Sequence, residues 1–178
     1  MYVSHILNNA VLGVIGFILS AYSVYVEHKV EHKDDSPDGD EFKALCDIES
    51  IGASCSAVFS LPEGKMLSFF GLIPKGHALD IPNGVLGMLF YFFTIIRFFV
   101  KRKTQQSWGG IFNVLFGNSI FLVISSLALA SSVFLGRKLY IIREFCVVCV
   151  STHIINTTVW IRAIMEKFDS RSSKKKNN

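Results

Sequence analysis

The chain has 178 residues, of which 51% are hydrophobic and 18% charged, and its mean hydropathy is +0.42. This composition is typical of a small integral membrane protein and leaves room for no soluble domain beyond one long loop. The net charge is only +4 and no dense basic stripe is present, which argues against nucleic acid as a partner. We therefore predict a single membrane domain over residues 1–178.

Four segments are predicted to cross the membrane as helices, at about residues 6–26, 83–100, 111–135 and 145–164. The first contains no Asp, Glu, Lys or Arg from Val3 to Val26. At about 1.5 Å per residue it is long enough to cross a hydrocarbon core roughly 30 Å thick. A cleaved signal peptide is the alternative, but the run is long and neither Lys nor Arg precedes it. The fold class is therefore all-α, a four-transmembrane-helix bundle with a lumenal cap.

Residues 27–82 are predicted to form that cap, as a lumenal redox loop. Its first part, Glu27 to Lys43, is strongly charged and is expected to lie in water. The serines and alanines around Cys55 permit a short helix there. The apolar pieces between residues 60 and 82 are too short to span and are expected to dip into the interface or cover a pocket. Residues 136–144 are predicted to form a tight return, and Arg97 is expected to snorkel outward.

The basic residues indicate the orientation of the bundle. Four spans place both termini on one side, and Lys and Arg cluster at residues 101–103 and in the tail, 165–178. We expect that side to be cytosolic. The last residues, Lys175-Lys176-Asn177-Asn178, resemble a dilysine retrieval signal. The prediction is a multi-pass protein of the endoplasmic reticulum membrane, surrounded by membrane lipid, with cytosolic N- and C-termini.

Four cysteines fall into two pairs, Cys46 with Cys55 in the loop and Cys146 with Cys149 at the start of the fourth span. Cysteines at i and i+3 share one helix face, and a helix N-terminus favours the reactive thiolate. Packing as small hydrophobes is the alternative. Two lumenal pairs indicate a relay that passes electrons from a soluble thiol carrier to the loop pair, then to the helix pair. Exchange requires one loop cysteine to reach one helix cysteine.

The electron acceptor expected inside a bilayer is a lipid-soluble quinone, as substrate, with no bound cofactor or metal. His153 lies one turn deeper than Cys149, followed by Asn156 and Trp160, and a neutral imidazole can donate a hydrogen bond to a quinone carbonyl. The alternative is that His153 and Asn156 bond only to neighbouring helices. Asn83, at the mouth of the second span, is a second donor or a helix N-cap.

Aromatic side chains are the candidate walls of this quinone site, and each is otherwise ordinary packing. They are Phe59, Phe90 and Tyr91.

Three segments resemble the vitamin K epoxide reductase family. They are Cys46…Cys55-Ser-Ala-Val-Phe59, Asn83-Gly-Val-Leu-Gly-Met-Leu-Phe-Tyr91 and Phe145-Cys-Val-Val-Cys149-Val-Ser-Thr. The resemblance covers roughly residues 6–165. It implies a four-helix bundle around a quinone pocket, capped by the lumenal loop. It also implies reduction of vitamin K 2,3-epoxide to quinone, and of quinone to hydroquinone, in support of γ-glutamyl carboxylation.

The resemblance also implies a role for each cysteine. Cys149 attacks the substrate, and Cys146 is its resolving partner and exchanges with Cys55. Cys46 accepts electrons from a lumenal thioredoxin-like protein disulfide oxidoreductase. Among the other residues, Asn83 bonds one quinone carbonyl, and Phe59 and Phe90 pack on the ring.

The chain departs from the family pattern at His153, where vertebrate members usually carry a tyrosine that donates to the other carbonyl. Leu86 replaces an aromatic residue, and the spacing from Cys46 to Cys55 is one residue longer. Two other functions remain open. One is a quinone-coupled disulfide-forming oxidase for protein folding in the lumen, which uses the same residues. The other is a non-catalytic membrane scaffold with structural disulfides.

Overall fold

The computed structural model describes residues 2–31, 43–61, 64–103 and 116–176, apart from 49 and 51. Within these ranges, four helices are long and apolar enough to cross a membrane, and no strand is present. They are α1 (Tyr2–Glu31), α4 (Asn83–Lys103), α6 (Asn118–Ile142) and α7 (Val147–Lys176). The predicted all-α membrane bundle is confirmed.

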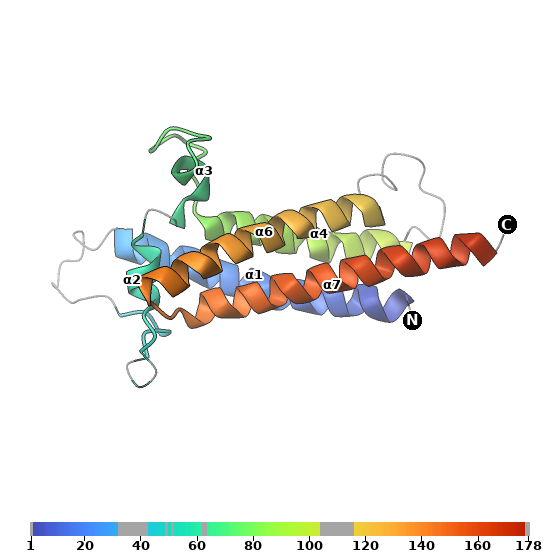
Figure 1. The fold of residues 1–178 in the computed structure, drawn as a ribbon, viewed down its shortest axis with the longest axis horizontal. Coiled ribbons are helices and arrows are strands. Elements are labelled where there is room, and N and C mark those ends of the chain that lie inside the picture. Colours follow the sequence, from blue (N-terminus) through green and yellow to red (C-terminus); the bar gives the residue numbers. More distant parts are fainter. Residues whose placement is uncertain are drawn as a thin grey trace.

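The long helices run side by side, with the start of α1 and the end of α7 at the same end of the bundle (Figure 1). Two short helices, α2 (Cys55–Phe59) and α3 (Met66–Phe69), lie at the opposite end. The described residues between α1 and α4 therefore form a cap over one end, as expected. Residues 32–42 of the predicted charged loop lie outside the described residues.

Small residues allow α1 and α4 to pack closely. A Cβ atom on Gly87 of α4 would lie 2.6 Å from the Ser20 Oγ of α1. A Cβ atom on Gly16 of α1 would overlap the ring of Tyr91. Glycine therefore brings the two backbones together where a larger side chain would separate them. The approach leaves Tyr91 only 1% exposed, between α1 and α7.

Several helix ends differ from the prediction. Residues 136–142 belong to α6 rather than to a return, because Arg137, Lys138 and Leu139 are good helix formers. The helix ends at Arg143, which has a left-handed φ of 58°. The start predicted for this span, residues 111–115, lies outside the described residues. At the other end of the chain, α7 continues to Lys176, so the predicted tail is helical over most of its length.

Arg97 does not snorkel outward, contrary to expectation. Its side chain is 1% exposed, and its Nη2 atom lies 2.9 Å from the Oε2 atom of Glu166, which is fully buried. Lys101 pairs with the other carboxylate oxygen at 2.8 Å. The guanidinium also lies 3.9 Å from the centre of the Phe121 ring. A carboxylate inside the bundle gives the cation a partner there, so it has no need to reach the interface.

Candidate redox site

The loop cysteines Cys46 and Cys55 form a disulfide, with an S–S distance of 2.05 Å. Cys55 is the first residue of α2, so the predicted short helix is confirmed. The side chain of Ser54 accepts the N–H of Ala57 and caps that helix. Serine suits this position because its oxygen satisfies an N–H that has no partner within the helix.

Asp47 holds the backbone on both sides of the disulfide. Its carboxylate accepts the Ser56 hydroxyl at 2.6 Å, the Ser56 N–H at 3.0 Å and the Ala44 N–H at 3.0 Å. Burial alone would raise the pKa of Asp47. The hydrogen bonds from Ser56, Ala44 and Cys55 outweigh it, and the pKa lies below its usual value. The loop pair therefore sits on an anchored turn.

A backbone contact joins this loop to the start of α7. Ala53 forms an antiparallel bridge with Ile48 and a parallel bridge with Phe145. The Ser54 N–H donates to the Phe145 carbonyl at 2.9 Å. The residues that follow on the two segments are Cys55 and Cys146, and their Sγ atoms lie 3.6 Å apart. The structure thus identifies the loop cysteine and the helix cysteine that meet.

Cys146 stands immediately before α7, where its thiol takes the place of a capping group. Its Sγ accepts the N–H of Cys149 at 3.2 Å. The Cys149 thiol and the N–H groups of Cys149 and Val148 hydrogen-bond to this sulfur, and they lower the pKa of the Cys146 thiol despite its burial. Cys146 and Cys149 are free thiols, so the loop pair is oxidised and the helix pair reduced.

A cavity of about 320 Å³ lies beneath the cap, between the four long helices. This volume falls within the range of small-molecule sites in proteins, roughly 300–1,000 Å³. Cys149 opens into the cavity, whereas Cys146 does not line it. Every side chain predicted to bind quinone is part of its wall: Asn83, His153, Phe59, Phe90 and Tyr91. Apolar side chains supply much of the remaining wall, among them Val58, Leu61, Leu86, Ile124, Leu127, Leu135 and Leu139.

His153 and Asn156 behave differently. Both ring nitrogens of His153 are buried and have no hydrogen-bond partner among the described residues. The amide of Asn156 accepts the Tyr91 hydroxyl at 2.8 Å and donates to the Ser132 Oγ at 2.8 Å. Asn156 therefore bonds to neighbouring helices, and it also lines the cavity. Trp160, which donates to Ser126 at 3.0 Å, is not part of the cavity wall.

Asn83 connects the cap to the bundle. It is the first residue of α4, and its side-chain carbonyl accepts the N–H of Met66 at 2.9 Å. Met66 begins α3 and also lines the cavity. The amide group of Asn83 is therefore oriented by the cap at the cavity mouth.

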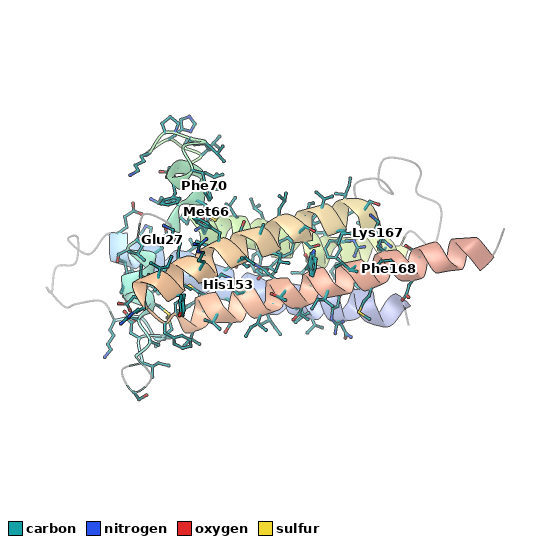
Figure 2. All side chains as sticks on the ribbon, in the orientation of Figure 1. Glu27, Met66, Phe70, His153, Lys167 and Phe168 are labelled. Atoms are coloured by element: carbon teal, nitrogen blue, oxygen red, sulfur yellow. A yellow bond between two sulfur atoms is a disulfide. The ribbon has the colours of Figure 1, made fainter. Side chains whose placement is uncertain are left out.

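Glu27 is a cavity residue that the sequence analysis missed. It was assigned to the water-exposed loop, but α1 continues to Glu31 and leaves Glu27 only 6% exposed. Figure 2 shows Glu27, Met66 and His153 in the half of the bundle nearest α2 and α3, with Lys167 and Phe168 toward the other end. The available signal was weak, because the acid stands directly after the apolar run.

Comparisons with known proteins identify the family of this chain. The chain is 29% identical to the mouse vitamin K epoxide reductase complex subunit 1 over 169 residues, which cover 92% of this chain and 91% of that protein. It is also 29% identical to the rat protein of the same name over 151 residues, 82% of this chain and 80% of that protein. The model of the vitamin K epoxide reductase family matches residues 8–164. The chain therefore belongs to the vitamin K epoxide reductase family.

Proposed function

We propose that this protein reduces vitamin K 2,3-epoxide and vitamin K quinone with electrons from thiols, and so supports the vitamin K cycle for γ-glutamyl carboxylation. One observation carries the proposal. The Sγ atoms of Cys55 and Cys146 lie 3.6 Å apart, and the partner of Cys146, Cys149, opens into an apolar cavity. The loop disulfide is therefore close enough to exchange with the helix dithiol, and a lipid-soluble substrate in the cavity can reach that dithiol.

The electron path is two thiol–disulfide exchanges. The thiolate of Cys55 attacks Cys146 in an oxidised helix pair, and Cys149 leaves as a thiolate. The thiolate of Cys46 then attacks Cys55, which restores the loop disulfide and frees Cys146. Two electrons have moved from the loop pair to the helix pair. The arrangement of one disulfide and one dithiol is the state that follows this transfer.

The substrate step uses the helix pair. The sulfur of Cys149 attacks an epoxide carbon, so a C–S bond forms and a C–O bond breaks, and the proton of the Cys149 thiol passes to the epoxide oxygen, which becomes a hydroxyl group. The thiolate of Cys146 then attacks the Cys149 sulfur, which breaks the C–S bond and leaves the electron pair on the substrate. The hydroxyl group takes up one proton from water and leaves as a water molecule, which gives the quinone and the Cys146–Cys149 disulfide. The hydrogen bonds that lower the pKa of Cys146 favour the thiolate that this step needs.

The polar groups of the cavity give the substrate an orientation. His153, with both ring nitrogens buried in the cavity region, is the donor to one quinone carbonyl, and Asn83 is the donor to the other. Phe59, Phe90 and Tyr91 pack on the ring. A buried polar group without a hydrogen-bond partner lowers the stability of the protein. A ligand carbonyl that accepts a hydrogen bond from His153 would remove this cost.

The cellular setting belongs to the same proposal. We infer an endoplasmic reticulum location, cytosolic termini and a lumenal cap that takes electrons from a thioredoxin-like protein disulfide oxidoreductase. Support comes from the basic residues near the termini, and from the position of the loop disulfide at the end of the bundle away from both termini.

Turnover of vitamin K 2,3-epoxide by the purified protein in detergent tests the proposal. Dithiothreitol supplies the electrons, and liquid chromatography follows the quinone. We expect quinone with the wild type and none with Cys149→Ala. Reduction of plain quinone without reduction of epoxide would favour the disulfide-forming oxidase. A folded protein inactive on both would refute the proposal and favour the scaffold.

A further inference from the structure

A second pocket, about 430 Å³ in volume, adjoins the redox cavity at the capped end. The two share three wall residues, Glu27, Phe59 and Leu61. Most of the other residues that line the second pocket have polar or charged side chains, among them Glu31, Lys65, Ser68, Lys75 and Asp80. Glu27 is the one ionisable side chain among the described residues that lines both. It therefore stands between a charged, water-accessible pocket and an apolar cavity.

Glu27 is enclosed rather than displayed to solvent. It is 6% exposed, and a Cβ atom placed on Gly64 would lie 3.5 Å from its Oε1 atom. This is an ordinary van der Waals distance, so the backbone of the cap at Gly64 lies close to the carboxyl group. An acidic side chain inside a membrane helix is costly, and such residues commonly serve function.

The charged groups that face Glu27 come from several elements. Lys65 precedes α3, Asp80 precedes α4, and Glu31 is one turn further along α1. Lys65 is engaged by Glu31, with an Nζ–Oε1 distance of 2.9 Å. On the cavity side, the ionisable groups are Tyr91 of α4, Lys138 of α6, and His153 and the thiol of Cys149 on α7. The helix α2 contributes no ionisable side chain besides the disulfide-bonded Cys55.

We propose that Glu27 passes protons from the charged pocket into the redox cavity, to the oxygen of the quinone as it is reduced. This inference rests on the proposed function. Reduction of quinone to hydroquinone takes two electrons from the two helix sulfurs, which become the Cys146–Cys149 disulfide, and adds one proton to each quinone oxygen. Cys149 brings one proton as a thiol. Glu27 supplies the second, becomes a carboxylate, and regains a proton from water in the charged pocket.

The need for such a group follows from the chemistry of Cys146. A sulfur that reacts as a thiolate has already lost its proton, and that proton must return by another route. The walls of the cavity are mainly apolar, so bulk water does not deliver it readily. A carboxyl group that lines both pockets provides the route. Positioned acids of this kind contribute roughly 10²- to 10⁴-fold to the rate of a proton-coupled step.

The test is single-turnover reduction of vitamin K quinone by the full-length, pre-reduced protein in detergent, over a range of pH. The wild-type rate should rise with pH as Cys146 becomes a thiolate, then fall as Glu27 loses its proton. Glu27→Gln should be about 100-fold slower at the optimum and should lack the falling limb. Glu144→Gln is the matched control, because Glu144 is an acid at the capped end of the bundle that lines neither pocket. It should keep both limbs.

The outcomes separate this inference from the function on which it rests. A wild type that does not reduce quinone would defeat the proposed function. An active wild type whose profile Glu27→Gln matches would overturn the proton route, and so would a slow variant that keeps both limbs. If Glu27→Gln does not fold, the proton route is tested by infrared difference spectra of the protein, recorded before and after quinone is added. A protonated carboxyl band should change, and should move in Glu27→Asp; a missing or unmoved band would overturn the route.

Discussion

Replacing Glu166 by glutamine should destabilise the bundle markedly. Glu166 is fully buried and pairs with Arg97, itself 1% exposed, and with the more accessible Lys101. The substitution keeps the shape of the side chain and removes its charge. Arg97 then remains in the interior without its counter-ion, and a buried charge that loses its partner destabilises a protein by about 3–5 kcal/mol.

Arg97 keeps two hydrogen bonds in the variant, so we expect the loss of stability to lie near the lower end of this range. Its Nε atom still donates to the Phe116 carbonyl at 3.2 Å, and its Nη2 atom to the Asn118 side chain at 3.0 Å. We therefore expect a loss of about 3 kcal/mol. For a chain of this size, 1 kcal/mol corresponds to about 2–4 °C, so Tm should fall by about 6–12 °C.

Thermal unfolding in detergent, followed by circular dichroism, measures this shift. Lys167→Gln, at the neighbouring residue outside the cluster, is the control and should change Tm by no more than about 2 °C. The double variant Arg97→Met with Glu166→Leu should recover much of the loss, because it removes both charges. A Glu166→Gln protein that melts within about 2 °C of the wild type would refute the reasoning.

Three further predictions concern the redox site. Cys149→Ala should abolish epoxide turnover with any reductant, whereas Cys55→Ala should spare turnover with dithiothreitol and lose it with a protein disulfide oxidoreductase; equal loss in both assays would contradict the relay. His153→Tyr should change the KM for quinone or the sensitivity to coumarin-type inhibitors, and no change in either would remove His153 from the site. Gly16→Ala should cost about 1–3 kcal/mol by displacing the Tyr91 ring, read as a lower Tm, and an unchanged Tm would show that the contact relaxes freely.

Hydropathy and short spacings were enough to predict much of this protein. Runs without charge predicted four membrane helices, since only a helix satisfies its own backbone hydrogen bonds in hydrocarbon. The i, i+3 and i+4 spacings predicted that Cys149 and His153 share a face, and both line the same cavity. Flanking serine and alanine predicted the short helix at Cys55. These features depend on residues close together in the chain.

Other features depend on contacts between distant residues, and local patterns do not encode them. Cys55 and Cys146 are 91 residues apart and meet because a backbone bridge aligns Ala53 with Phe145. Arg97 is buried because α7 brings a carboxylate to it. Glu27 followed an apolar run and was assigned to the loop by its charge, yet the cap closes over it. In each case the free energy of a polar group depends on which partners packing supplies, and that is settled only when the helices assemble.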